Sequence, residues 1–299
     1  MSHYDYIIIG AGSAGCVLAN RLSENPNHSV LLLEAGPSDK RFFVQMPIGY
    51  GKTFYQPKVN WMYNSMASDG LNGRTSYWPR GKTLGGSSSI NAMVYVRGHK
   101  QDFDDWSNAG NKGWGYDQVL PYFKRMESWQ HGEDAFRGGS GPLNVSDVSA
   151  NLHPLCKHFV AAGEALGFTY NADMNGVKQE GVGYYQLTTH QGQRMSAARA
   201  YLKPARKRPN LTVVCEALVQ RIVFEGKRAV AVEYEHNGSS HRAHGAKEIC
   251  LSAGAVNSPQ LLQLSGIGPG QVLQQAGVEP VYESPAVGQH LQDHIGHSY

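Results

Sequence analysis

The chain has 299 residues, of which 41% are hydrophobic and 17% are charged, and its formal net charge is +3. This hydrophobic content is sufficient to build a buried core in one large domain or in two smaller ones. The weak net charge, and a densest basic cluster at 206–208 that contains no aromatic residues, argue against nucleic-acid binding. No apolar run approaches the roughly 18 residues that a membrane-spanning helix needs.

The four cysteines are far apart in the sequence and form no CxxC pair. They are therefore predicted to be reduced thiols, and no metal site is expected. The N-terminus lacks the basic segment and the long apolar segment of a secretory signal. We therefore expect a cytoplasmic protein, either soluble or attached peripherally to the inner face of the membrane.

The first 33 residues alternate between strand and helix patterns. Residues 6–9 form a short apolar run, residues 16–22 have helical periodicity, and residues 30–33 form a second apolar run. Such continuous apolar strands are typical of a parallel sheet buried on both faces. The pattern predicts a βαβ unit at the start of an α/β fold.

The rest of the chain is less regular. Residues 36–79 are rich in Pro, Gly, Asn and aromatic residues and are predicted to make an irregular excursion over the sheet. Amphipathic patterns then predict two helices, and apolar runs predict strands that return to the first sheet. The predicted helices cover 117–129 and 155–166, and the predicted strands cover 211–214, 219–224, 229–234 and 249–253.

A glycine motif connects the first predicted strand to the first helix. Gly10 permits a tight turn, Gly12 allows the backbone to approach a pyrophosphate, and Gly15 allows close packing of helix and strand. Glu34 ends the second strand, where a carboxylate can accept hydrogen bonds from a ribose hydroxyl. Because strand, helix, strand and acid occur in register, the motif predicts dinucleotide binding. It does not by itself distinguish FAD from NAD.

Two further glycine-rich stretches follow. Residues 81–93 combine small residues and hydroxyls, a composition that lets the backbone pass close to a flat ligand or a phosphate. Residues 251–268 are typical of a strand, a glycine turn and a helix that stops at a glycine. The pattern of residues 251–268 is equally compatible with a structural and a functional role.

Taken together, these stretches resemble the glucose–methanol–choline (GMC) oxidoreductase family. Segments 193–202 and 287–294 resemble two more of its motifs, so the resemblance covers essentially the whole chain. It implies an α/β fold with a Rossmann-like FAD-binding domain and part of an α+β substrate domain. The expected division is 1–145 and 199–290 for the FAD-binding domain, 146–198 for the start of the substrate domain, and 291–299 for the start of a further substrate-domain segment.

The resemblance also implies FAD as cofactor. A histidine that tethers flavin in some relatives is replaced here by Ile90, so non-covalent binding is expected. Trp61 matches an aromatic near the cofactor, although a role as a core aromatic fits it equally well. The cofactor-binding residues implied by the family motifs are Gly10, Gly12, Ser13, Ala14, Gly15, Glu34, Ala35, Trp61, Thr83, Gly85, Gly86, Asn91, Ala92, Met93, Val94 and Val219.

The activity implied by the family is oxidation of a primary alcohol to an aldehyde, with hydride transfer to flavin N5. The amino-acid sequence of the motifs is most similar to that of bacterial FAD-dependent alcohol dehydrogenases, and choline dehydrogenases are the next most similar. A dehydrogenase that passes electrons to a quinone-like acceptor is favoured over an oxidase. The alternative from another class is a non-catalytic FAD-binding fragment.

In this family the catalytic base is a histidine of the C-terminal portion, which is expected beyond Tyr299. His290, His294 and His297 cluster near the end of the sequence, but His294 matches a family position that is not the base. No residue of this chain is therefore assigned as catalytic. We expect the chain to be a fragment of a longer enzyme.

Overall fold

The structure is a computed structural model that describes residues 2–293. The chain divides into two compact units. Unit 1 contains residues 1–41, 51–90 and 197–299, and unit 2 contains residues 42–50 and 91–196. The predicted division placed 1–145 in one domain, whereas residues 42–50 and 91–145 belong to unit 2; the functional assignment of the domains stays a prediction. The second boundary, at 196/197, lies close to the predicted 198/199.

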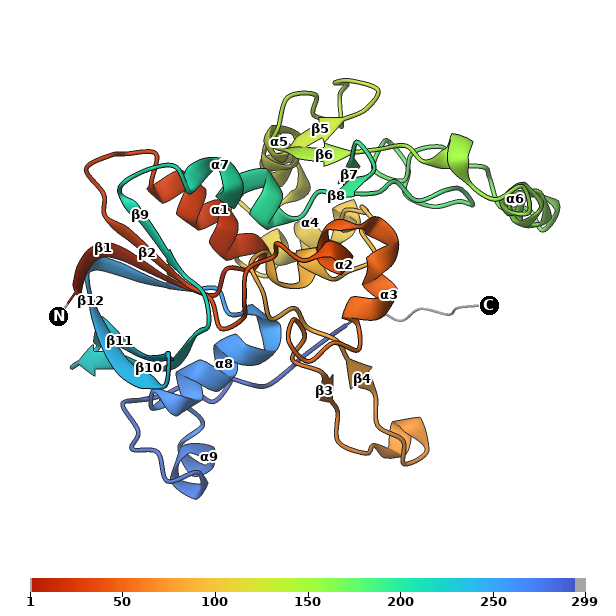
Figure 1. The fold of residues 1–299 in the computed structure, drawn as a ribbon. Coiled ribbons are helices and arrows are strands. Elements are labelled where there is room, and N and C mark those ends of the chain that lie inside the picture. Colours follow the sequence, from red (N-terminus) through yellow and green to blue (C-terminus); the bar gives the residue numbers. More distant parts are fainter. Residues whose placement is uncertain (1, 294–299) are drawn as a thin grey trace. The chain divides into compact units, whose positions relative to one another are not determined.

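Unit 1 is built on one six-stranded sheet with the order β10-β11-β12-β1-β2-β9 (Figure 1). Strands β12, β1, β2 and β9 run parallel, and β10 and β11 add an antiparallel edge. The predicted Rossmann-like arrangement is confirmed. The strands are β1 (Ser2–Ile9), β2 (Val30–Leu33), β9 (Leu211–Val214), β10 (Ala217–Glu225), β11 (Arg228–His236) and β12 (Ser239–Leu251).

The alternation of apolar residues sets the two faces of this sheet. Ile7 pairs with Leu31 and Ile9 with Leu33, and all four are almost fully buried in one core cluster. Leu261 of α8 (Gly254–Leu264) joins the same cluster. Since successive side chains of a strand point to opposite faces, the intervening residues of β1 and β2 face the other side of the sheet.

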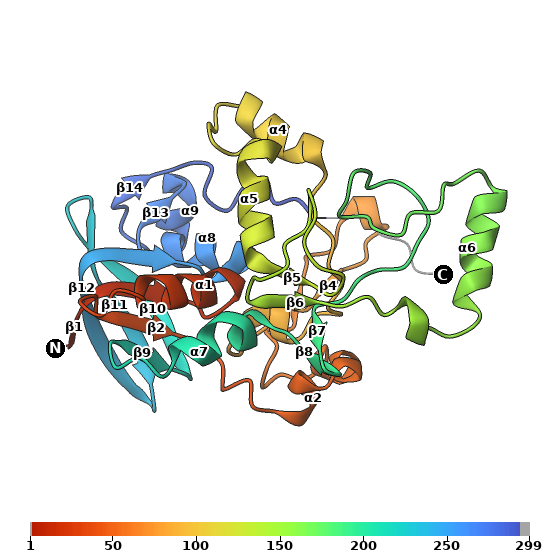
Figure 2. The ribbon, with the colours of Figure 1, turned by 90° about the horizontal axis from the view of Figure 1, so that it is seen from above.

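Helix α1 (Ser13–Leu22) covers that other side, where Cys16 and Ala19 are fully buried. Helix α7 (Lys203–Ala205) lies beside it, as Figures 1 and 2 show. The sheet of unit 1 is thus covered by α1 on one face and α8 on the other. Small elements complete the unit: β3 (Tyr63–Asn64), β4 (Tyr77–Trp78), β13 (Ile267–Gly268), β14 (Tyr282–Glu283) and α9 (Gly270–Gln275).

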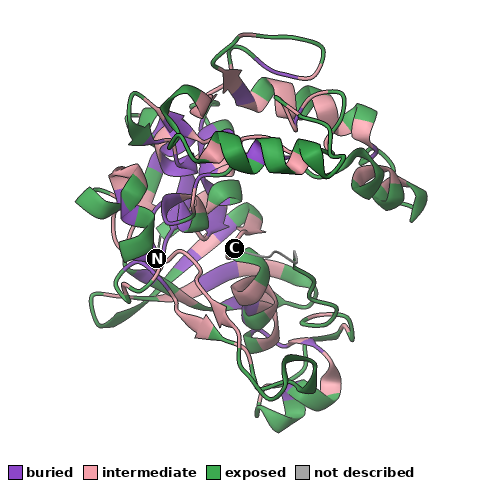
Figure 3. Cartoon of the chain, turned by 90° about the vertical axis from the view of Figure 1, so that its right-hand side faces the viewer, coloured by how far each residue is buried: buried purple, intermediate pink, exposed green. Residues whose placement is uncertain are grey.

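Unit 2 has short strands and helices instead of an extended sheet. Its helix α6 buries only Val160 and is green over most of its surface in Figure 3. Among residues 2–293, none of the helices combines the length and the apolar character that crossing a bilayer requires. The elements are α2 (Phe42–Gln45), α4 (Lys100–Asn108), α5 (Tyr116–Met126), β5 (Glu127–Trp129), β6 (Leu143–Val145), α6 (Cys156–Ala165), β7 (Thr189–His190) and β8 (Gln193–Arg194).

A buried ionic cluster organises the interior of unit 2. The Glu127 carboxylate accepts hydrogen bonds from Arg97 Nη2 at 2.6 Å and from Arg137 Nε at 3.0 Å. Arg137 Nη1 also donates to Asp173 at 2.8 Å, and its guanidinium lies 4.2 Å from the Trp129 ring centroid. The side chains of Glu127 and Arg137 are fully buried. Buried charges persist when they are paired and hydrogen-bonded, as they are here.

We expect Glu127→Gln to lower the free energy of unfolding by about 3–5 kcal/mol, because it leaves two buried guanidinium groups without their shared carboxylate. Glu133→Gln is the matched control: Glu133 pairs with Lys124 at 3.2 Å and its side chain is 62% exposed. The control should cost less than about 1 kcal/mol. Urea unfolding of both variants measures the difference, and equal losses would show that the cluster does not stabilise unit 2.

Candidate functional site

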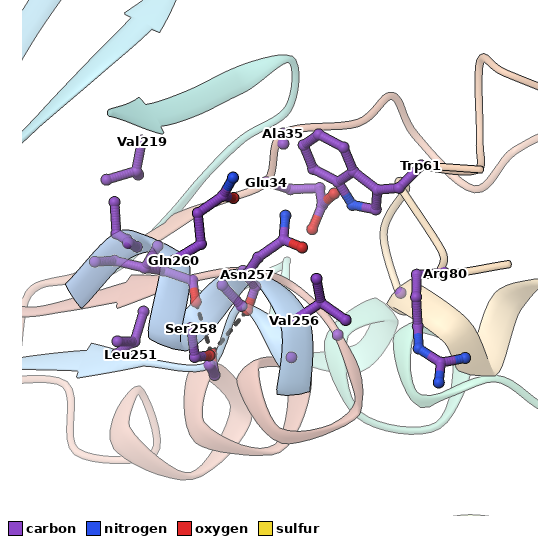
Figure 4. Close-up of a pocket in the computed structure, with 18 of the residues that line it drawn as sticks. Glu34, Ala35, Trp61, Arg80, Val219, Leu251, Val256, Asn257, Ser258 and Gln260 are labelled. Carbon is purple, nitrogen blue, oxygen red and sulfur yellow. Dashed lines mark hydrogen bonds between the residues drawn. The ribbon is translucent and has the colours of Figure 1, made fainter. Parts of the chain in front are cut away.

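A cavity of about 990 Å³ lies in unit 1 at the carboxyl ends of three parallel strands. It is lined by Gly10 after β1, Glu34 after β2 and Ser252 after β12. Ligands of open α/β sheets bind at this edge of the sheet, outside the strand ends. Of the predicted cofactor-binding residues, the lining includes Gly10, Gly12, Ser13, Ala14, Glu34, Ala35, Trp61, Gly86 and Val219, and Figure 4 labels four of them.

The N-terminus of α1 opens into this cavity. Gly12 is the N-cap residue, no side chain caps the helix, and its first turn contains no acidic residue. Ser13 and Ala14 follow in exposed positions and line the cavity. The first N–H groups of a helix have no partner within the helix, and the helix dipole favours an anion there. This end of the cavity is therefore suited to a phosphate group.

The glycines of the motif have different roles. A Cβ at Gly15 would lie 1.9 Å from the carbonyl oxygen of Gly10, so Gly15 is required for packing of α1 against the preceding turn. A Cβ at Gly12 would meet only Ser252 O, at 4.0 Å. Protein atoms therefore leave the space beside Gly12 open. The absence of a side chain at Gly12 fits close approach of a ligand, as the motif predicts.

Glu34 lies at the end of β2 and is only 5% exposed. Its Oε2 accepts a hydrogen bond from Ala11 N at 2.9 Å, and its Oε1 accepts one from Gly36 N at 2.9 Å. Burial raises the pKa of Glu34 to about 7, although these two N–H groups favour the ionised form. Each carboxylate oxygen has a second lone pair, so Glu34 fixes the turn and can still accept a ligand hydroxyl.

The second glycine-rich stretch holds the first in place. Gly85 N donates to Ala11 O at 2.7 Å, and a Cβ at Gly86 would lie 2.7 Å from the Cα of Gly12. Thr83 is fully buried, and its Oγ1 donates to Pro37 O at 2.8 Å. Gly86 therefore lines the cavity. The other three residues, Gly15, Thr83 and Gly85, support the loops around the cavity without lining it.

An aromatic wall extends the cavity. Trp61 stacks on Tyr63 with ring centroids 5.9 Å apart, and Lys82 Nζ lies 4.6 Å from the Trp61 centroid. Tyr63 Oη donates to Asn257 Oδ1 of α8 at 2.9 Å, and burial raises the pKa of Tyr63. Trp61 lines the cavity, and its contact with the cofactor stays a prediction; Tyr63 and Asn257 also line the cavity but were missed by the motifs. No local pattern indicates Tyr63 or Asn257 as part of the site, since Met62 between Trp61 and Tyr63 has a positive φ of 56° and breaks any strand alternation.

Four of the predicted cofactor-binding residues, the segment Asn91–Val94, belong to unit 2, and their contact with the cofactor stays a prediction. Asn91 Oδ1 accepts hydrogen bonds from Arg194 Nη1 at 2.8 Å and from Met93 N at 3.1 Å. Arg194 Nη1 also donates to Asn91 O, and burial lowers the pKa of Arg194 to about 10, so it remains cationic at neutral pH. The segment is thereby fixed within unit 2.

None of the described histidines lines the cavity. His290 is exposed and has a positive φ of 59°. His294 and His297 lie outside the described residues, as does most of the predicted segment 291–299. The cavity of unit 1 therefore shows the features of a binding site and contains no described imidazole that could act as a base.

Known proteins resemble this chain closely. An oxygen-dependent choline dehydrogenase of Vibrio vulnificus is 53% identical and covers 98% of the chain, and an alcohol dehydrogenase [acceptor] of Pseudomonas putida is 47% identical over 98% of it. The solved structure of an FAD-dependent oxidoreductase from Chaetomium thermophilum has a TM-score of 0.89 and 34% identity, covering 97% of this chain and 52% of that one.

The chain spans about half the length of the curated relatives that it matches, 52% of the first and 53% of the second. The sequence pattern described as GMC oxidoreductase matches residues 4–296. This match covers nearly the whole chain and agrees with the fold, the cavity and the glycine motifs. The chain belongs to the GMC oxidoreductase family.

Proposed function

We propose that this chain binds FAD non-covalently, with the ADP half of the cofactor in the cavity of unit 1. The observation that carries the proposal is the open space beside Gly12 at the uncapped N-terminus of α1, next to the buried carboxylate of Glu34. Together these groups supply the anion site and the hydroxyl acceptor that an adenosine diphosphate requires. The solved relative from Chaetomium thermophilum, named as FAD-dependent, supports FAD over NAD.

The family motifs also include Asn91–Val94 of unit 2 among the cofactor-binding residues, and we keep this assignment within the same proposal. The segment Asn91–Val94 would contact the flavin ring, with the Asn91 amide oriented by Arg194. Because Asn91 Oδ1 already accepts two hydrogen bonds, its exposed Nδ2 is left to donate. Position 90 is a buried isoleucine, which supports non-covalent attachment.

The proposed reaction of the whole protein is oxidation of a primary alcohol to an aldehyde. When bound, FAD supplies the hydride acceptor at N5. The residues of this chain bind and orient the cofactor, and the base that takes the hydroxyl proton would come from the second half that the curated relatives possess. The relative named as an alcohol dehydrogenase supports this substrate class.

Choline is the second candidate substrate. The relative at 53% identity is named as a choline dehydrogenase, and its identity exceeds that of the alcohol dehydrogenase at 47%. The two candidates share the same oxidation of a primary hydroxyl group, so the same cofactor site serves both. They differ in whether a quaternary ammonium group must be bound.

We further propose that the reduced cofactor passes its electrons to a quinone-like acceptor, and that the protein is cytoplasmic or attached to the inner face of the membrane. The choice of acceptor rests on the resemblance to relatives named as dehydrogenases. Cell fractionation tests the location, and reduction of a soluble quinone analogue compared with oxygen consumption tests the acceptor.

The activity is tested with two proteins: the 299-residue chain and a version extended by the second half of its relatives. Both are placed under argon with FAD, a panel of primary alcohols, and choline. We expect the flavin absorbance of the extended protein to be lost on addition of its substrate, whereas the absorbance of the shorter chain persists. This outcome identifies the shorter chain as an FAD-binding module.

The same experiment discriminates the alternatives. Loss of absorbance with primary alcohols but not with choline would identify a primary alcohol as the substrate. Loss with choline but not with the alcohols would identify choline. Loss of absorbance in the shorter chain would show that the base is already present within its 299 residues. Persistence of the flavin absorbance in the extended protein with every substrate would contradict alcohol oxidation altogether.

A further inference from the structure

The described lining of the cavity contains only two charged residues, Glu34 and Arg80. Glu34 lies after β2, whereas Arg80 precedes the second glycine-rich stretch. In Figure 4 the Arg80 side chain lies at the end of the cavity away from Val219. The cofactor-binding residues that were predicted from the family motifs do not include Arg80.

Close backbone packing connects Arg80 to the N-terminus of α1. A Cβ at Gly81 would lie 2.1 Å from the carbonyl carbon of Gly86, and a Cβ at Gly86 would lie 2.7 Å from the Cα of Gly12. Arg80 therefore immediately precedes a loop that contacts the proposed phosphate site directly. The guanidinium group is planar and has five N–H donors, which suits recognition of phosphate oxygens.

The Arg80 side chain is held loosely. Its Nη1 donates to Pro79 O at 2.9 Å, and its guanidinium carbon lies 5.1 Å from the Trp78 ring centroid. Its Nη2 lies 3.6 Å from Asp293 Oδ2, beyond ordinary hydrogen-bond length, and the two side chains are 35% and 47% exposed. An exposed ion pair of this kind contributes little free energy, so a stronger anion can displace it.

We propose that Arg80 is the cationic residue that binds the diphosphate in this cavity, and that Asp293 competes with the diphosphate for it. The inference rests on the proposed function, because it assumes a dinucleotide in the cavity. A diphosphate carries more charge than the carboxylate and is also bound by the N-terminus of α1. Binding of the ligand and attachment of Asp293 to Arg80 then oppose each other by the same factor.

ADP and adenosine are the probes that separate the diphosphate from the rest of the ligand. Their affinities are measured by calorimetry on the chain freed of flavin. We expect Arg80→Met to weaken ADP binding by about 10-fold or more, since a charge-assisted hydrogen bond is lost, and to leave adenosine binding within about 2-fold. Arg80→Lys keeps the charge without the planar group and should lie between the two.

Arg228→Met is the matched control, because Arg228 is exposed on the β10–β11 hairpin and does not line the cavity. It should leave both affinities unchanged. Asp293→Asn should tighten ADP binding by about 2- to 5-fold, because Arg80 loses its competing carboxylate. Raising the salt concentration should weaken ADP binding in the parent more than in Arg80→Met.

Equal ADP affinities of the parent and Arg80→Met would overturn the assignment of Arg80. Weaker ADP binding in Asp293→Asn would overturn the competition and make Asp293 a residue that positions Arg80. If Arg80→Met also loses adenosine, Arg80→Lys decides, since a purely structural role predicts equal losses of both ligands. Failure of the parent to bind ADP would instead refute the proposed function, which keeps the two failures distinguishable.

Discussion

Replacing Gly12 by alanine is expected to abolish binding of FAD and ADP while the folded chain keeps its stability. The new methyl group would meet no protein atom closer than 4.0 Å, and Gly12 has an ordinary φ of −73° that alanine adopts. It would instead occupy the space that the diphosphate needs. We expect affinity to fall by about 100-fold or more, and the free energy of unfolding to change by less than about 1 kcal/mol.

Gly15→Ala provides the contrasting variant on the same helix. Its methyl group would lie 1.9 Å from Gly10 O, so α1 must move away from the turn. The expected loss is about 3 kcal/mol of unfolding free energy or more, because overpacked positions cannot relax without backbone shifts. Urea unfolding and FAD titration of both variants test the pair. Gly12→Ala binding FAD like the parent would contradict the placement of the diphosphate.

Glu34→Gln has the second large expected effect. The amide can accept only through its oxygen, so one of the two buried N–H groups, Ala11 N or Gly36 N, loses its acceptor. The ribose hydroxyl also loses its carboxylate acceptor. We expect ADP affinity to fall by about 10- to 100-fold, and Glu225→Gln, on the exposed hairpin, to have no effect.

The raised pKa of Glu34 also predicts a pH dependence of stability. The folded chain holds this proton with a pKa of about 7, against an ordinary value of 4.5. Between these values the folded state binds more protons than the unfolded state, so stability falls as pH rises through this window. The free energy of unfolding should therefore be higher by roughly 3 kcal/mol below pH 4.5 than above pH 7. This contribution is fully present below pH 4.5 and is lost above pH 7. Glu34→Gln should remove this decline.

Ligand binding should respond to pH in the opposite direction. A ribose hydroxyl donates best to the ionised carboxylate, so ADP affinity should rise with pH through about 7 more steeply in the parent than in Glu34→Gln, where only the ADP phosphate still titrates in this range. Calorimetry at several pH values measures both profiles. Equal pH profiles of the parent and Glu34→Gln would show that Glu34 does not accept a ligand hydroxyl.

The sequence predicts the first βαβ unit well because its signals are local. The apolar runs at 6–9 and 30–33 lie within β1 and β2, and the predicted helix 16–22 lies within α1. The prediction for β12 captured only its end, since the observed strand begins at Ser239. Residues 239–248 are mostly polar and exposed, so they lack the apolar pattern that indicates a strand. Helix α4 was also missed, because Phe103 and Trp106 are its only two apolar residues and are too few to form an amphipathic pattern.

In the candidate site, too, the residues of a local motif could be predicted and those brought together over a long sequence separation could not. The turn glycines and Glu34 are found from spacing, because one short motif positions all of them. Asn257 and Tyr63 meet across 194 residues of sequence, and Arg80 meets Asp293 across more than 200, so no local pattern predicts either contact. The buried cluster around Glu127 was likewise missed, since paired buried charges have the same local sequence as exposed ones.

The most direct test of this account is an FAD titration of the flavin-free chain, followed by flavin fluorescence and repeated in the presence of ADP. We predict saturable binding with one FAD per chain, competition by ADP, and loss of both in Gly12→Ala. FAD binding that ADP does not displace, or no FAD binding by a folded chain, would contradict the assignment of the cavity in unit 1 to the ADP half of the cofactor.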